Sequence, residues 1–365
     1  MRLLVLCGLS FMADAMEVTL LAFMSICAGV EWHLNDSQMA SITSAVFAGQ
    51  FIGGLFWGPF ADVYGRRKSY MLTISIISIG GFVSGISPNY LFLVACRMIV
   101  GFGVGGLTVP FDLLAEFIPA NVRGEYLMKM EYFWTLGGLF VAGSAWIILT
   151  SSGWRALTIV SAVPVTVTAI IGYFLLPESP RWLLEQGRTE EAEQVLKQAM
   201  EFNGSTINEM KFKLAPMSHP SDHVNGQNDY TAEGQDGATS DSIATSASHG
   251  TAQSQPTLFE LFRIQCILYK NLLRSENIGY SVPLWGAWFT FGFCYYGVIL
   301  FISRLYNSGG DPSNMVCDFN FGPIFINASA ELFGLFSCIQ VVDVWGRPFL
   351  MFVTYILSAA TALGM

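Results

Sequence analysis

Long apolar runs restrict the fold of this chain more than any other feature of its sequence. Runs of roughly 20 residues or more, long enough to cross about 30 Å of hydrocarbon as a helix, occupy 3–30, 37–61, 69–87, 90–115, 126–149, 156–176, 278–303 and 322–342, and a ninth begins near 349. Only 12% of the residues are charged. Because the bilayer interior offers the backbone no hydrogen-bond partner, such runs are expected to be helices. The sequence therefore predicts an all-α, multi-pass membrane protein.

Cationic side chains gather on one side of these runs. They are Arg2, Arg66, Arg67, Lys68, Arg123, Lys129, Arg181, Arg188, Lys270, Arg274 and Arg347, whereas Arg155 and Arg304 lie on the other side. Because Lys and Arg are retained in cytoplasmic loops, the N-terminus and the long loop after the sixth run are predicted to be cytoplasmic. The chain then divides into a six-helix transmembrane bundle over 1–182, a cytoplasmic loop over 183–276 and a partial second transmembrane bundle over 277–365.

Within that loop, 189–200 has the pattern of an amphipathic helix. The segment 203–255 is poor in large apolar residues and is predicted to be disordered, with a possible role in binding a cytoplasmic partner. It contains His219 and His223, which have the spacing of a helical metal pair but no helical pattern around them, so no metal is predicted. The scattered cysteines show no paired spacing and are interpreted as buried or unreactive thiols.

Few charged residues lie inside the predicted spans, and three of them are candidates for proton coupling. Asp14 and Glu17 share a face of the first helix because they are three residues apart, and Arg97 lies at a similar depth on the fourth run. An intramembrane charge costs at least ~2.5–3.5 kcal/mol on insertion scales, so it needs a partner or a water-filled cavity. Asp14 is predicted to carry a transported proton, with Arg97 as its exchangeable partner and Glu17 as relay or reserve acid. The alternative is a permanent ion pair that only joins two helices.

A short basic turn between apolar runs occurs twice. Its Asp-x-x-Gly-Arg core is present at 62–66 and again at 343–347, as expected of an internally duplicated transporter. Charged residues near the same ends of the spans are predicted to form a conformational latch, with static bracing of the loops as the alternative. The latch candidates are Asp62, Gly65, Arg66, Arg67, Glu116, Arg123, Glu178, Arg181, Asp343 and Arg347.

Four aromatic residues lie within the fifth and seventh runs, namely Trp134, Trp288, Tyr295 and Tyr296. The two tryptophans are near mid-depth, whereas the residues of an interfacial aromatic belt would be at the edges. A stacking cage for a flat or cationic ligand is one interpretation, and ordinary helix packing is the other.

Taken together, the ordered motifs resemble the major facilitator superfamily, in its sugar-porter-like branch. They are Gly58-x-x-x-Asp62-x-x-Gly65-Arg66-Arg67, Arg97-x-x-x-Gly101-x-Gly103-x-Gly105, Glu116-x6-Arg123, Pro177-Glu-Ser-Pro-Arg181 and Asp343-x-x-Gly346-Arg347. Within that branch, the stretches 11–18, 286–297 and 330–334 are similar to the synaptic vesicle glycoprotein two family and its related transporters.

This resemblance implies two six-helix bundles, the second incomplete in this chain, with a central site and alternating access. It also implies that Trp134, Trp288, Tyr295 and Tyr296 surround a small-molecule pocket. The glutamine-rich seventh-span motif of true sugar porters is absent, which argues against a hexose. Organic ions and small aromatic acids such as nicotinate are the solutes that the resemblance favours.

The function predicted from these features is secondary active transport of a small organic solute by alternating access, coupled to protons, in a plasma or vesicle membrane. The alternatives are a uniporter, and a membrane regulatory or scaffold protein that keeps the fold without transport. The sequence shows no nucleophile with a nearby base and no phosphate-binding loop, so no enzymatic activity, cofactor or nucleic-acid partner is predicted.

Overall fold

The computed structural model describes residues 2–119, 122–202, 258–274, 276–309 and 316–364. Within these ranges the chain is helical apart from its connections and one isolated bridge between Asn307 and Phe319. The helices are α1 (Arg2–Glu31), α2 (Asp36–Tyr64), α3 (Arg66–Gly85), α4 (Tyr90–Val104), α5 (Val109–Phe117), α6 (Arg123–Leu175), α7 (Pro180–Glu185), α8 (Thr189–Phe202), α9 (Leu258–Leu272), α10 (Ile278–Leu305), α11 (Phe321–Trp345) and α12 (Arg347–Gly364). The all-α prediction is confirmed for the described residues.

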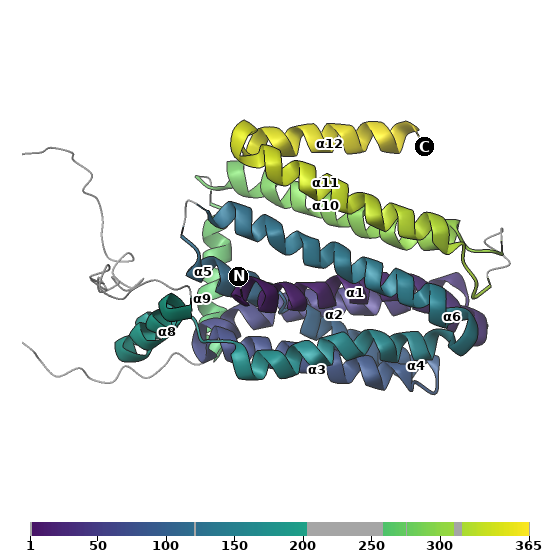
Figure 1. The fold of residues 1–365 in the computed structure, drawn as a ribbon, viewed down its shortest axis with the longest axis horizontal. Coiled ribbons are helices and arrows are strands. Elements are labelled where there is room, and N and C mark those ends of the chain that lie inside the picture. Colours follow the sequence, from purple (N-terminus) through teal and green to yellow (C-terminus); the bar gives the residue numbers. More distant parts are fainter. Residues whose placement is uncertain (1, 120–121, 203–257, 275, 310–315, 365) are drawn as a thin grey trace, which may run out of the picture.

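The long helices run roughly parallel and form two groups (Figure 1). In the first group α1 packs against α6, and α2 packs against α4. The second group comprises α10, α11 and α12, and it meets the first where α1 contacts α10 and α6 contacts α11. We call the end of the bundle that carries the 65–68 turn the basic end. The other end, where the chain passes from α10 to α11, is the distal end.

Six helical segments in the described part of the chain are long and apolar enough to cross a membrane. One of them, Tyr90–Phe117, consists of α4 and α5 with a turn at 105–108 between them. The segments differ from the predicted spans in two further respects. The runs 126–149 and 156–176 share one label, α6, but they are two helices that meet at Gly153, where the backbone is non-helical and the chain turns back (Figure 1). The φ of Gly153 is 76°, a conformation that glycine adopts without steric cost. The run 69–87 forms α3, which is helical but is not among the six. Its polar side chains explain this, because several serines and one threonine lie along it.

Glycines bring the backbones of α2 and α4 into direct contact. A Cβ atom added at Gly101 would lie 2.0 Å from the carbonyl oxygen of Val46, and one added at Gly49 would lie 2.1 Å from that of Met98. Small residues allow such close approach of membrane helices. The glycine spacing therefore has a packing role here.

Substitution of Gly101 by alanine should destabilise the protein by about 1–3 kcal/mol, the range typical of overpacking, because the backbone of α2 would have to move. Thermal unfolding in detergent measures the effect. Gly58→Ala is the matched control, because nothing lies within 4 Å of a Cβ at that position of α2. Equal melting temperatures for the two variants would contradict this account of the α2–α4 contact.

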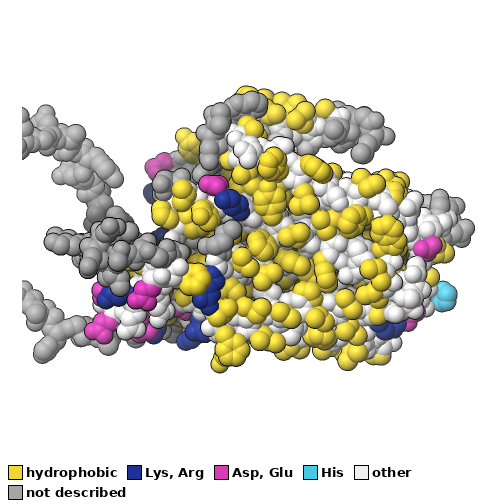
Figure 2. Space-filling view, in the orientation of Figure 1, with side chains coloured by type: hydrophobic (Ala, Val, Ile, Leu, Met, Phe, Trp, Pro, Cys, Tyr) yellow, Lys and Arg dark blue, Asp and Glu magenta, His cyan; other side chains and the backbone are white. Residues whose placement is uncertain are grey.

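Apolar side chains cover the middle of the molecule and charged ones gather toward its ends (Figure 2). Exposed apolar residues on this belt include Phe51, Ile79 and Ile147. A surface of this kind is expected where lipid replaces water. The protein is an integral membrane protein whose lipid-facing surface lies between two polar ends.

The predicted amphipathic helix is confirmed as α8, which extends two residues beyond the predicted range and contains a 3.0 Å ion pair between Lys197 and Glu193. It contacts α7 at the basic end. The predictions for 203–255, including those for His219 and His223, fall outside the described residues.

Candidate functional site

The buried arginine of α4 is paired with a carboxylate of α1. Arg97 is 0% exposed, and its Nη1 donates to Glu17 Oε2 at 2.8 Å while its Nε donates to Ser84 Oγ at 3.1 Å. The residue predicted to pair with Arg97 was Asp14, and this is corrected: the partner in the structure is Glu17. Glu17 lies one turn further along α1, at a depth that the Arg97 guanidinium reaches, and residue positions along the predicted spans cannot resolve one helical turn.

Asp14 is the carboxyl group left without a cation. It is buried, and its Oδ1 has no hydrogen-bond partner within the described part of the chain. The neighbouring groups are Glu17, already engaged by Arg97, and Tyr296, which lies within electrostatic range of Asp14. Asp14 therefore differs chemically from Glu17, although both occupy one face of α1.

A cavity of about 660 Å³ lies between the two groups of helices. Its wall includes Thr19 of α1, Trp134 of α6, Tyr295 of α10 and Glu331 of α11. Trp134 Nε1 donates to the Tyr295 hydroxyl at 2.5 Å, and that hydroxyl donates to Glu331 Oε1 at 2.9 Å. This relay fixes two aromatic faces and a carboxylate beside one cavity, so an indole, a phenol and an acid can act on the same ligand.

Two acidic residues near this cavity were not among the predicted site residues. Glu331 lines it directly, and Glu131, one turn before Thr135 on α6, lies within electrostatic range of Glu331. In the described ranges neither carboxylate forms an ion pair. Each is an acid on an otherwise apolar run, and the cost of an intramembrane charge was the signal that could have identified them.

The four predicted aromatic residues do not all belong to the cavity. Trp134 and Tyr295 line it, whereas Tyr296 lies behind it, with ring centroids 6.4 Å from Trp134 and 5.3 Å from Phe47. Trp288 does not line it: its residue is 67% exposed and its ring packs edge-on against Phe291. Trp288 is seven residues, about two turns, before Tyr295 on α10, and this displacement carries it away from the cavity.

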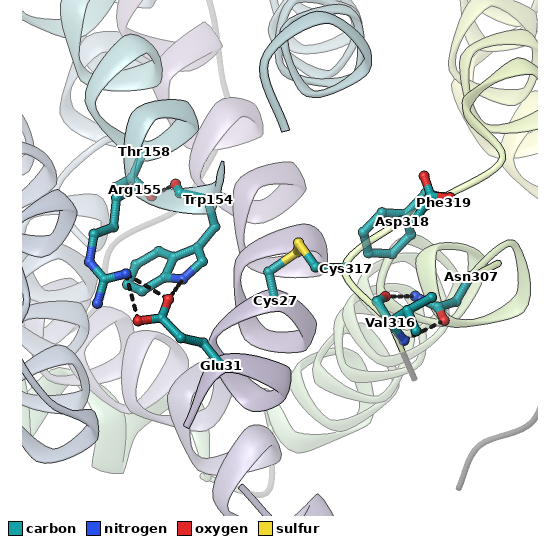
Figure 3. Close-up of a disulfide and its surroundings, with 10 residues drawn as sticks. All are labelled: Cys27, Glu31, Trp154, Arg155, Thr158, Asn307, Val316, Cys317, Asp318 and Phe319. Atoms are coloured by element: carbon teal, nitrogen blue, oxygen red, sulfur yellow. Dashed lines mark hydrogen bonds and ion pairs between the residues drawn. A yellow bond between two sulfur atoms is a disulfide. The ribbon is translucent and has the colours of Figure 1, made fainter. Parts of the chain in front are cut away.

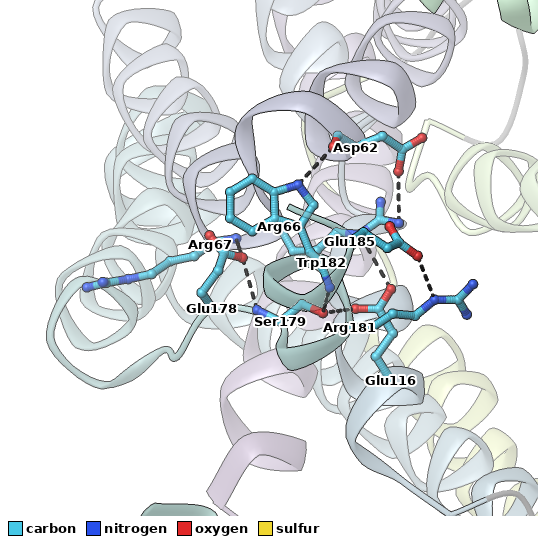
Figure 4. A network of polar contacts seen from close by, with 9 residues as sticks. All are labelled: Asp62, Arg66, Arg67, Glu116, Glu178, Ser179, Arg181, Trp182 and Glu185. Carbon is cyan, nitrogen blue, oxygen red and sulfur yellow. Dashed lines mark hydrogen bonds and ion pairs between the residues drawn. The ribbon is translucent and has the colours of Figure 1, made fainter. Parts of the chain in front are cut away.

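A polar network braces the basic end (Figure 4). Arg66 pairs with Asp62 at 2.9 Å and contacts Glu116 at 3.6 Å, while Glu178 accepts from the backbone N–H of Arg67 at 3.0 Å. Gly65 has a φ of 103°, and a Cβ there would lie 2.5 Å from the Glu178 carboxylate. The turn, α5 and the segment before α7 are thus held together within the first group of helices.

Other predicted latch residues have different partners. Arg123 donates to the carbonyl oxygen of Ile118 at 3.1 Å and is not part of this network. Arg181 pairs with Glu185 on its own helix at 3.1 Å. The side chains of Asp343 and Arg347 lie outside the described residues. A role for these positions in the transport cycle stays a prediction.

At the distal end, a disulfide joins Cys27 of α1 to Cys317, in the connection between α10 and α11 (Figure 3). The interpretation of all cysteines as thiols is therefore wrong for this pair. The two residues are 290 positions apart, so no local spacing could have indicated the bond. One turn after Cys27, Glu31 accepts from Arg155 Nη1 at 2.6 Å and from Trp154 Nε1 at 2.7 Å.

The architecture is that expected of a membrane transporter: a helical bundle with buried charges and a cavity between two groups of helices. Residues 10–228 match the family described as "Sugar (and other) transporter". The chain belongs to this family, in the major facilitator superfamily, which confirms the family resemblance and the expectation that the protein is not an enzyme.

Known relatives agree with this membership. The chain is 32% identical to the Organic cation/carnitine transporter 7 of Arabidopsis thaliana over 93% of its length, and 29% identical to the Synaptic vesicle 2-related protein of Xenopus laevis over 99%. It spans 67% and 60% of those proteins. The solved proton:xylose symporter XylE shares the fold, with a TM-score of 0.50 and 22% identity over 54% of this chain and 49% of that one.

Proposed function

We propose that the protein is a secondary active transporter that moves a small organic cation by alternating access, coupled to protons. The observation that carries the proposal is the cavity between the two groups of helices, in which Trp134, Tyr295 and Glu331 are joined by hydrogen bonds. Alternating access requires a site at such an interface, because rocking of one bundle against the other then exposes it to either side.

The charges around the cavity favour a cation over the other predicted class, small aromatic acids. Glu331 lines the cavity and Glu131 lies near it, and among the described residues no lysine or arginine offsets them. A ligand carboxylate would meet these acids, whereas an ammonium group would be attracted to them and to the faces of Trp134 and Tyr295. The name of the plant relative, an organic cation/carnitine transporter, agrees with this choice.

Asp14 is the proposed proton carrier. Intramembrane carboxyl groups serve proton relays in transporters, and Asp14 is buried with an unpartnered oxygen while Glu17 is held by Arg97. In this arrangement Arg97 stabilises Glu17 in one state and is able to approach Asp14 when the helices shift. Glu17 remains the reserve candidate.

We propose that the basic end faces the cytoplasm, in a plasma or vesicle membrane. The loop cations lie at that end, as the positive-inside rule requires. The disulfide lies at the other end, and disulfides persist in oxidising compartments rather than in the cytosol. Two independent arguments therefore support the same orientation.

Replacing Glu331 by glutamine should weaken binding of tetraethylammonium by about 10- to 100-fold, because a hydrogen-bonded charge in a protected site contributes roughly 1.5–3 kcal/mol. Equilibrium binding to purified protein measures the change. Glu185→Gln, the same substitution at a half-exposed side chain of α7, is the control and should bind as the parent does. Stronger binding of nicotinate than of tetraethylammonium by the parent would contradict the cation assignment.

A transport-inactive regulatory or scaffold protein is the alternative from another class. Such a protein would have no use for the cavity acids, and it would show neither tetraethylammonium binding in the experiment above nor uptake into liposomes. A uniporter would show uptake that does not respond to a pH gradient.

A further inference from the structure

The Cys27–Cys317 disulfide connects the two groups of helices covalently. Cys27 is on α1, in the first group, and Cys317 lies four residues before α11, in the second. Their Cα atoms are 4.7 Å apart. While the bond is intact, the two groups cannot separate at the distal end by more than this link allows.

The Cys317 side is tied firmly to the second group. Backbone bonds from Ser308 to Asp318 and from Asn320 to Tyr306, at 2.9 and 2.8 Å, join the segment before α11 to the end of α10. The Asn307 side chain also donates to the Val316 carbonyl at 2.5 Å. Cys317 therefore moves with α10 and α11.

The Cys27 side is tied equally firmly to the first group. Glu31, one turn further along α1, is held by Arg155 and Trp154 of α6, and the Arg155 guanidinium lies 4.5 Å from the centroid of the Trp154 ring (Figure 3). Arg155 also donates to the carbonyl of Ser87, after α3. The distal end of α1 is thereby fixed to two neighbours and cannot follow Cys317.

An aromatic cluster beside the cavity joins the two groups of helices near the disulfide. Phe23 of α1 lines the cavity, and its ring centroid is 5.2 Å from that of Phe319 and 5.9 Å from that of Phe321. Phe319 is two residues after Cys317, and Phe23 is one turn before Cys27. The disulfide and the ring cluster thus span the same gap between the two groups of helices.

We propose that this disulfide is a redox-controlled lock on the distal gate of the transporter: the oxidised protein holds Phe23 against Phe319 and Phe321, and reduction allows the gate to open. The inference rests on the alternating access proposed above. In the reaction a thiolate of an external dithiol attacks Cys317 Sγ, because the Cys317 residue is partly exposed while Cys27 is 1% exposed. This step forms a mixed disulfide between Cys317 and the reductant, and Cys27 leaves as a thiolate that takes up a proton. The second thiol of the reductant then attacks the reductant's own sulfur in the mixed disulfide. Cys317 is released as a thiolate, and the reductant becomes a cyclic disulfide.

The first test establishes the bond. A protease site is inserted after Gln235, between the two cysteines, and free thiols are blocked with N-ethylmaleimide before denaturation. Cleaved parent should run as one band without reductant and as two fragments with dithiothreitol, whereas Cys317→Ser should give two fragments in both. Cys338→Ser, a free cysteine elsewhere, should behave as the parent. Two fragments from the unreduced parent would overturn the proposal.

The second test measures the gate without any solute. Ser303, buried on the wall of the cavity near this end, is replaced by cysteine, and Cys294, on the same wall, by serine. We expect an impermeant maleimide to label Ser303→Cys about 10-fold faster when Cys27 and Cys317 are both serine, because minor conformations are commonly about 0.1–10% populated. Equal labelling rates, with the disulfide present in the parent, would show that the bond does not control the gate.

A third measurement needs no substitution in the lock. Uptake of tetraethylammonium by parent protein in liposomes should rise several-fold after an impermeant phosphine reductant is added. A fall or no change on reduction would contradict the lock. Absence of uptake in both states, with labelling that responds to the disulfide, would instead leave the lock standing and reject the transport function.

Discussion

Replacing Arg97 by methionine should destabilise the folded protein by about 3–5 kcal/mol, because removal of one member of a buried ion pair leaves the other charge uncompensated. Arg97 is fully buried and donates to Glu17 at 2.8 Å. Methionine keeps an unbranched apolar stem of similar length, so most of the loss reports the charge rather than a cavity. Thermal unfolding in detergent, followed through the loss of monodisperse protein, measures the effect.

A second substitution separates the ion pair from packing. Glu17→Gln combined with Arg97→Met removes both charges, and this double variant should recover much of the stability lost in Arg97→Met alone. Arg155→Met, which removes a half-exposed arginine at the distal end, is the comparison for loss of a less buried pair and should cost less. Additive losses in the double variant would mean that Arg97 and Glu17 act independently.

Asp14→Asn should abolish accumulation of solute driven by a pH gradient while leaving solute exchange across the membrane intact. Asparagine has the shape of a protonated aspartate but cannot release a proton, so the cycle would continue without coupling. Asp14 is the proposed proton carrier because its Oδ1 has no partner among the described residues while Glu17 is engaged by Arg97. Uptake into liposomes with and without an imposed gradient separates accumulation from exchange.

Asp36→Asn is the matched control, since Asp36 is exposed in the first turn of α2. This variant should accumulate solute as the parent does. If Asp14→Asn still concentrates tetraethylammonium, Asp14 is not the coupling group, and Glu17→Gln becomes the next variant to test. Loss of both exchange and accumulation would point to a structural role for Asp14.

The predictions from sequence agree with the structure where the interacting residues are close together in the chain. The apolar runs predicted the spanning segments, because a bilayer requires each of them to satisfy its own backbone, although the run 90–115 is divided into α4 and α5. The same local reasoning predicted α8 and the tight turn at Gly65. The break at Gly153 was also local, and the polar boundary between the two predicted runs indicated it.

For contacts between distant segments, the sequence limited the set of candidate residues but did not show which of them pair. The insertion cost of a charge identified Asp14, Glu17 and Arg97 as a set, yet the choice of Glu17 as partner depends on one helical turn of depth. Aromatic composition likewise suggested Trp288 and Trp134 together. Trp288, which is exposed, and Tyr295, which lines the cavity, are two turns apart on α10, and only the position of the cavity along that helix separates them.

By itself the sequence determined a helical membrane bundle with a basic end and a few costly charges, because those features depend on each segment's own transfer energy and on loop charge. The tertiary structure alone decided that Cys27 meets Cys317, that Glu331 joins Trp134 through Tyr295, and that Arg66 reaches Glu116. These pairs depend on how helices pack and rotate against one another. Each helix forms its backbone hydrogen bonds internally, so the packing between helices is set by how their side chains fit together. That fit involves two segments and is not encoded in either one alone.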